Sequence, residues 1–282
     1  MSRSIRKFVL QIIVPVTLLV LPIFLPAYNS TFDVSILLTA VSLVFAILVG
    51  FFIAAATTNY LRLQSLIADE DSALMSIFRL GKMVQPSITA KLRRLIDDYA
   101  TFALDFELGE YVDKTKIQFD ALISFLDGLS PKGAKGMELL GNLQDKKDLM
   151  IRTRQEITLV ARKVVTGLHW TVLVSLDVLL VFLLLSLRDG GIVLSLITGI
   201  LSASLYLVLV LLHEIDSNVF LEEMLAYQDT QMVFETIGTM KYLPGIALKN
   251  KRVAKPRGDY RLGILKGGSD LAEREIKVIR GV

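Results

Sequence analysis

One carboxylate lies in the middle of a long apolar stretch of the sequence. Asp177 stands between Leu168 and Leu187, in a segment that is otherwise almost entirely hydrophobic. A charged carboxylate at the centre of a bilayer is costly unless it is paired, hydrated or protonated. Asp177 is therefore a candidate for an ion path or for proton coupling, and the alternative is a protonated, hydrogen-bonded acid with a structural role. Its candidate hydroxyl and amide partners are Gln11, Thr39, Ser175, Thr198 and Tyr206.

No other group of residues has the spacing of a catalytic or metal site. The chain has no cysteine and two histidines, and neither His169 nor His213 belongs to a zinc-ligand pattern. His213, Glu214 and Asp216 could hold a cation loosely, but an interfacial polar anchor explains them more simply. Phosphate-binding loops, dinucleotide-binding glycines and nucleophile elbows are absent. We therefore expect a protein that is not an enzyme and has no cofactor.

The charged clusters predict solvent-exposed or lipid-facing surfaces rather than ion-binding or catalytic sites. The acidic runs at 69–71, 97–98 and 222–223 consist of adjacent residues, which point to different sides of a helix and are expected to be solvated. The basic residues lack interleaved aromatic side chains, so nucleic acid is a poor partner for them. Anionic lipid head groups are the expected partners of Arg152, Arg154, Arg162, Lys163, Lys249, Lys251 and Arg252.

The apolar segments that surround Asp177 have the length of membrane spans. The chain has 282 residues, of which 53% are hydrophobic and 21% charged, with a mean hydropathy of +0.55. A spanning helix needs about 20 mostly apolar residues. The alternative for the first segment is a signal peptide, but that segment contains two prolines and has no small-residue cleavage pattern. Four segments qualify: Phe8 to Ala27, Val34 to Ala56, Leu168 to Leu187 and Ile192 to Leu212.

The positions of Lys and Arg predict the topology. The loop from Tyr28 to Asp33 has none, and the connection before the fourth segment has only Arg188. Basic residues instead gather at the N-terminus, before the third segment and after the fourth. Because such residues are retained on the cytoplasmic side, we expect a multi-pass protein of the plasma membrane or bacterial inner membrane, with both termini cytoplasmic.

The region between the second and third spans predicts a helical bundle. One helix should leave the membrane and run to about Val84, since Pro86 ends it. Ser87 should cap the next helix, another should cover residues 114–129, and one from about residue 137 should enter the third span directly. We expect an all-α integral membrane protein divided as 1–56 (first pair of spans), 57–167 (cytoplasmic helices), 168–212 (second pair) and 213–282 (an amphipathic helix and a basic tail).

Two spans carry small residues at every fourth position, which places them on one helix face. Such a face permits close packing within or between protomers, and the sharper interpretation is a smooth pore wall. Both interpretations favour association. The residues are Ser42, Ala46, Gly50 and Ala54 in the second span, and Ser195, Gly199 and Ala203 in the fourth.

The order of two spans, a long helical region, two spans and an inner tail resembles the bestrophins, and more closely the bacterial bestrophin-like proteins. Residues 57–62 resemble that family's exit from its second helix. Residues 212–220 are similar to its segment after the last span, although Val219 stands where the family has proline. No counterpart of the calcium-sensing acidic cluster of animal bestrophins is present, which argues against gating by calcium.

The resemblance implies a homo-oligomer, a pentamer by analogy, with second spans around a central path for inorganic anions. On that analogy Phe45, Val49 and Phe52 are candidates for a hydrophobic constriction. The function expected is thus an oligomeric ion channel or ion-permeation protein. The alternative is a membrane-anchored interaction or signalling protein without transport, and the two differ in whether a ring-like oligomer forms.

Overall fold

The computed structural model of the protein describes residues 9–25, 34–106, 110–187, 191–217, 226–245, 258–266 and 273–280. The chain divides into two compact units. We call residues 1–59 and 163–217 the apolar unit, and residues 60–162 and 218–282 the polar unit.

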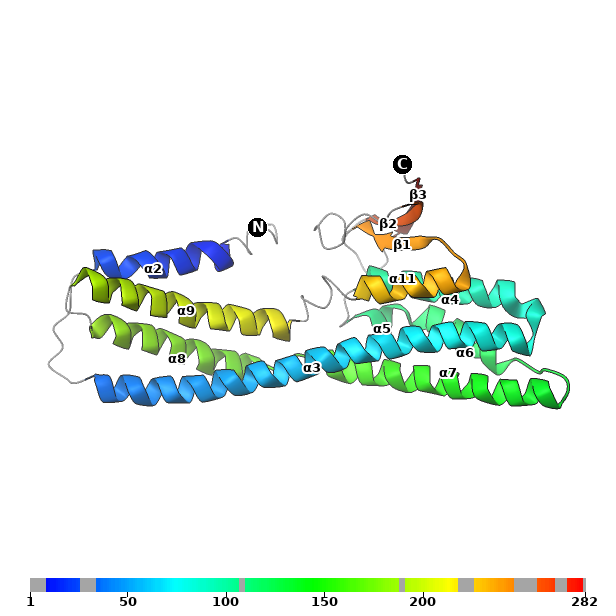
Figure 1. The fold of residues 1–282 in the computed structure, drawn as a ribbon, viewed down its shortest axis with the longest axis horizontal. Helices are drawn as coiled ribbons and strands as arrows, with labels where there is room; N and C mark the ends of the chain where they lie inside the picture. Colours follow the sequence, from blue (N-terminus) through cyan, green and yellow to red (C-terminus); the bar gives the residue numbers. More distant parts are fainter. Residues whose placement is uncertain are drawn as a thin grey trace. The chain divides into compact units, whose positions relative to one another are not determined.

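The apolar unit consists of apolar helices that run side by side (Figure 1). A π-helical turn, η1 (Val9–Ile13), leads into α2 (Val14–Phe24). The N-terminal half of α3 (Ser35–Val84), α8 (Gly167–Ser186) and α9 (Ile192–Asp216) complete the unit. Its core is made by side chains of α3, α8 and α9: Phe45, Val49, Phe52, Ala56, Leu173, Leu180, Leu209 and Leu212.

Three of the four predicted spans have the length of a membrane helix. Within the described residues, α3, α8 and α9 are long and apolar enough to cross a membrane, whereas the helix over Gln11–Phe24 is shorter. Pro15 lies at the start of α2 and Pro22 lies inside it, and a proline removes a backbone donor from the helix ladder.

The length of α3 follows the prediction. The helix runs without interruption from Ser35 to Val84, because no proline interrupts the sequence before Pro86. Gln85 then adopts an extended backbone with φ −154° and ψ 100°, as expected for a residue that precedes proline. The next helix begins with a 3-10 turn rather than with a Ser87 cap, and its Thr89 hydroxyl donates to the Pro86 carbonyl at 2.7 Å.

The prediction of one continuous helix that enters the third span is wrong. Helix α7 (Ala134–Val160) ends six residues before α8 begins at Gly167. Asp216 stabilises the non-helical segment before α8. Its Oδ1 accepts hydrogen bonds from the backbone N–H groups of Val164 at 2.7 Å and Val165 at 3.1 Å. Thr166 and His169 then form a capping box at the start of α8, which satisfies backbone donors at the new helix end.

The polar unit packs its helices around one hydrophobic core. Its elements are the C-terminal half of α3, η2 (Pro86–Ile88), α4 (Thr89–Asp105), α5 (Tyr111–Lys114), α6 (Lys116–Asp127), α7 and α11 (Ala226–Ile237). Helix α4 shows why they associate: Leu92, Ile96 and Tyr99 recur at three- and four-residue spacing and are all buried.

A three-stranded sheet completes the polar unit, so the all-α prediction is wrong for the C-terminal segment. The strand order is β1 (Lys241–Pro244), β2 (Tyr260–Lys266), β3 (Glu273–Ile279). Strands β1 and β2 pair in parallel and β2 and β3 antiparallel. The strands have four, seven and seven residues, and their Lys, Glu and Gly residues have low strand propensity, so the strands depend on tertiary contacts for stability.

Candidate functional site

The three candidates for a constriction lie inside the apolar unit. Phe45, Val49 and Phe52 are 4%, 4% and 7% exposed and pack in the core that α3 shares with α8 and α9. Phe52 also contacts the His169 ring, with 4.8 Å between ring centroids. These side chains therefore do not lie on the exposed face of α3.

The small residues of α3 lie on that outer face. Ser42, Ala46, Gly50 and Ala54 are all exposed. A Cβ atom added to Gly50 would meet no atom within 4 Å. Next to this row lie large apolar side chains that are more than half exposed: Leu43, Ile47 and Phe51. Among the described residues, this face of α3 is thus apolar and exposed.

The small residues of α9 have the opposite environment. Ser195 and Ala203 are buried, and a Cβ atom on Gly199 would lie 2.2 Å from the backbone oxygen of Leu19. Helix α2 therefore packs against α9 at backbone distance, as small residues in membrane helices allow. The small residues of α9 are therefore buried by packing within the chain.

Asp177 is buried in the apolar unit and has no hydrogen-bond partner among the residues that the structure describes. It is 7% exposed and lies on α8 between Leu173 and Leu180, which are core residues. Its Oδ1 is buried and unpartnered among the described residues. Of its predicted partners, Tyr206 also has a buried hydroxyl oxygen without a hydrogen-bond partner among the described residues. Thr39 instead donates to the Ser35 carbonyl at 2.9 Å, and Gln11 donates to Glu214.

The acidic run at 69–71 is not a solvated face, which corrects the prediction. Asp69 is exposed, but Glu70 and Asp71 are each 6% exposed. Tyr99 donates its hydroxyl hydrogen to Glu70, and Arg154 donates to the Tyr99 oxygen at 2.7 Å. Burial raises the pKa of the Tyr99 hydroxyl well above its ordinary value, and the neighbouring Glu70 charge adds to the rise. Tyr99 therefore stays protonated and bridges the two charged groups.

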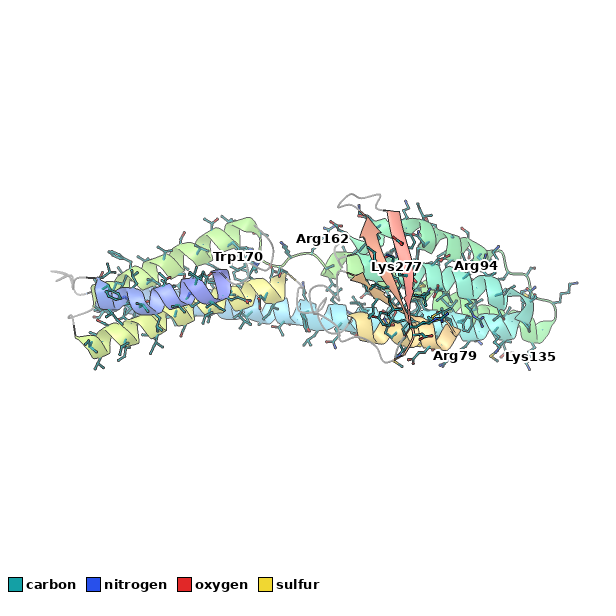
Figure 2. All side chains as sticks on the ribbon, turned by 90° about the horizontal axis from the view of Figure 1, so that it is seen from above. Arg79, Arg94, Lys135, Arg162, Trp170 and Lys277 are labelled. Carbon is teal, nitrogen blue, oxygen red and sulfur yellow. The ribbon has the colours of Figure 1, made fainter. Side chains whose placement is uncertain are left out.

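Arg154 consequently does not reach lipid head groups. Its side chain is 5% exposed, donates to the Val112 carbonyl as well as to Tyr99, and stacks over the Phe119 ring at 4.3 Å. Arg152, Arg162 and Lys163 are exposed and remain candidates for lipid contact; Arg162 is labelled in Figure 2. Lys249, Lys251 and Arg252 lie outside the described residues.

The sequence that forms the apolar helices matches a known protein family. The family model of the bestrophin-like domain matches residues 9–218, which include every helix of the apolar unit and most of the polar unit's helices. The chain belongs to the bestrophin-like family. The predicted resemblance to bestrophin-like proteins is thereby confirmed at the level of the family, which is one of membrane ion channels. No curated protein sequence matches the chain.

The fold of this bestrophin-like chain is similar to crystal structures of a bacterial bestrophin homolog from Klebsiella pneumoniae. One variant of that homolog has 12% sequence identity and a TM-score of 0.61, covering 83% of this chain and 100% of the other. Another has 12% identity and a TM-score of 0.60, covering 85% and 100%. A crystal structure described as a membrane protein is similar to the same degree, with 12% identity, a TM-score of 0.61 and coverage of 83% and 99%.

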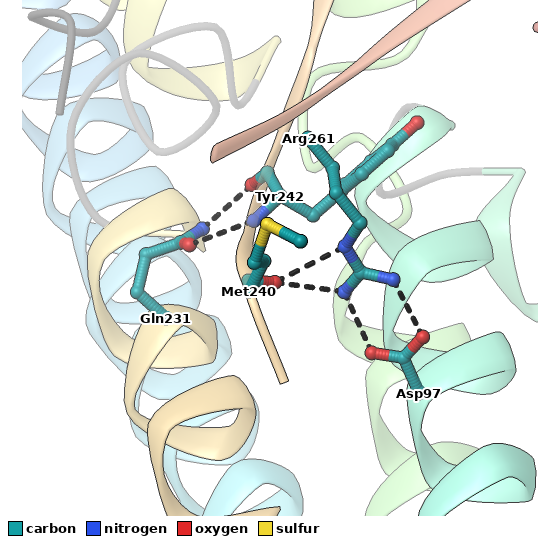
Figure 3. A network of polar contacts seen from close by, with 5 residues as sticks. All are labelled: Asp97, Gln231, Met240, Tyr242 and Arg261. Carbon is teal, nitrogen blue, oxygen red and sulfur yellow. Dashed lines mark hydrogen bonds and ion pairs between the residues drawn. The ribbon is translucent and has the colours of Figure 1, made fainter. Parts of the chain in front are cut away.

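The C-terminal segment of the bestrophin-like chain lies beyond the family match, and carboxylates of the helical bundle hold it. Figure 3 shows Arg261 of β2 donating to both oxygens of Asp97 at 2.6 Å and to the Met240 carbonyl. Tyr242 donates to Asp105 at 2.5 Å, and Thr230 donates to Asp71 at 3.0 Å. Sequence spacing gave no signal for these links, because their partners are 137 to 164 residues apart.

Proposed function

We propose that this protein is the subunit of a homo-oligomeric ion channel in a cell membrane, with the outer face of α3 lining a path between protomers. The observation that carries the proposal is the uncovered row of small residues on α3 in a chain of the bestrophin-like family. Helices with such faces associate closely in membranes. The proposal keeps the multi-pass topology and the cytoplasmic termini predicted from the positions of Lys and Arg.

In this proposal, residues other than those predicted from the sequence form the hydrophobic constriction. Phe45, Val49 and Phe52 pack inside the protomer, whereas Ile47 and Phe51 are 62% and 65% exposed and flank the small-residue row. Hydrophobic constrictions gate ion paths by excluding water. Ile47 and Phe51 are therefore our candidates for the narrow part of the path.

Inorganic anions are the proposed permeating species. Cation channels use rings of acidic side chains at their filters, and α3 has no acidic residue between Ser35 and Ala68. Arg62 is the first charged residue of α3, and it pairs with Glu156. A pentamer, as the family resemblance implies, would repeat this carboxylate-free face around the axis.

The test is ion flux in liposomes combined with the oligomer size in detergent. Gly50→Leu fills the small-residue row and should lower anion flux at least tenfold or shift the oligomer to smaller species. Gly141→Leu is the matched control, because Gly141 is an exposed helical glycine of the polar unit and also has no atom within 4 Å of an added Cβ. A chloride gradient, rather than a sodium gradient, should set the reversal potential.

Two outcomes would contradict the proposal. If Gly50→Leu retained both flux and oligomer size, the outer face of α3 would not be the path. If the wild-type protein were monomeric and gave no flux, the membrane-anchored interaction protein would be the better account.

A further inference from the structure

Three buried oxygen atoms of the apolar unit have no hydrogen-bond partner among the described residues. They are Oδ1 of Asp177, Oγ of Ser202 and the hydroxyl oxygen of Tyr206. Asp177 and Ser202 are 7% and 1% exposed. A buried polar group without a partner destabilises the folded state, and a charged one does so more strongly, so three such atoms in one small unit call for an explanation.

The three atoms come from two helices that pack against each other. Asp177 lies on α8, and Ser202 and Tyr206 lie one turn apart on the same side of α9. The two helices are in contact, and the three buried oxygen atoms lie near the middle of each helix. Asp177 points into the unit, since Leu173 and Leu180, one turn to either side, are core residues.

No protein charge in the surrounding helices neutralises Asp177. The segments 11–25, 35–59 and 192–212 contain no Asp, Glu, Lys, Arg or His. On α8 the other titratable group is His169, whose ring contacts Phe52 and whose Nδ1 accepts the backbone N–H of Thr166. The titratable residue of α9 between Ile192 and Leu212 is Tyr206, whose side chain is a phenol. Whatever balances the carboxylate therefore comes from solution.

We propose that Asp177, Ser202 and Tyr206 form a binding site for a small monovalent cation, of the sodium type, inside each protomer. Hard cations bind oxygen ligands, and one carboxylate with two hydroxyl oxygens supplies these with a single negative charge. The ion links α8 to α9 and neutralises the carboxylate. The site lies within the helices of one chain, so it is separate from the proposed path along α3 and does not depend on channel activity.

The test measures the thermal stability of the purified, detergent-solubilised protein in sodium chloride and in choline chloride at equal ionic strength and constant pH. A ligand that binds only the folded state raises the melting temperature as its concentration rises. Sodium should do so for the wild type, and choline should not. Asp177→Asn should raise the apparent dissociation constant for sodium at least tenfold, which corresponds to about 1.4 kcal/mol.

Matched variants keep the test decisive if Asp177→Asn folds poorly. Tyr206→Phe and Ser202→Ala each remove one oxygen and should weaken the sodium effect. Ser204→Ala is the control, because Ser204 is an exposed serine of α9 whose hydroxyl donates to the Ile200 carbonyl at 2.8 Å. Equal melting temperatures in sodium and choline, or a sodium effect retained by Asp177→Asn, would overturn the proposal. A melting temperature that responds to pH but not to sodium would identify a protonated structural acid instead and would also overturn it.

Discussion

The two rows of small residues in the apolar unit have the same spacing and opposite environments. On α9, Gly199 lies against the backbone of α2 and leaves no room for a side chain, whereas on α3 the space around Gly50 is open. The spacing of small residues therefore predicts that another helix can pack closely on that face. It does not predict which helix this is. One row stabilises the protomer, and the other is available to a second protomer or to an ion path.

Gly199→Leu should have the largest effect on protomer stability. An added Cβ would lie 2.2 Å from the Leu19 oxygen, and a backbone atom cannot give way as the end of a side chain can. Overpacking of a tight core costs about 1–3 kcal/mol and occasionally more, and here α2 would have to separate from α9. We expect a lower melting temperature in detergent and faster proteolysis near residues 14–24. Retention of the wild-type melting temperature would show that α2 does not pack closely on α9.

Ala203→Leu should have an intermediate effect on the same contact. Ala203 is 8% exposed and lies one turn from Gly199, but its own Cβ already fits, so the larger side chain must displace neighbours rather than backbone. We expect a loss of about 1–3 kcal/mol in the free energy of unfolding, measured by chemical denaturation in mixed micelles. An effect equal to that of Gly199→Leu would mean that the whole α9 face, rather than its glycine, sets the approach of α2.

The sequence predicted those features that depend on local patterns. The length of α3 follows from the absence of proline before Pro86, and the buried face of α4 follows from apolar residues at helical spacing. It did not predict the break before α8, because that break depends on Asp216, some fifty residues away in sequence, accepting hydrogen bonds from Val164 and Val165. The sheet was missed for the same reason: β1 and β2 are short and pair across an intervening segment.

For the candidate site, the sequence identified the residue types but not their orientation. Asp177 was singled out correctly as a buried carboxylate in an apolar unit, since hydropathy alone reveals it. Which face of α3 lies outward could not be read, because that helix is apolar all round between Ser35 and Ala56 and its core residues look like its exposed ones. Glu70 and Asp71 were misjudged because adjacent acids usually signal solvent, and their partners Tyr99 and Thr230 are distant in sequence.

The smallest effect on protomer stability is expected at Gly50. Gly50→Ala places a methyl group in open space and replaces glycine by a better helix former, a change worth up to about 1 kcal/mol in favour of the helix. The melting temperature of the monomeric form should therefore stay level or rise slightly, in contrast to Gly199→Ala, which meets the Leu19 backbone. The same variant should nevertheless alter oligomer size or flux if α3 faces another protomer. A clear loss of monomer stability at Gly50 would show that its face is covered within the chain, and the difference between the two rows would disappear.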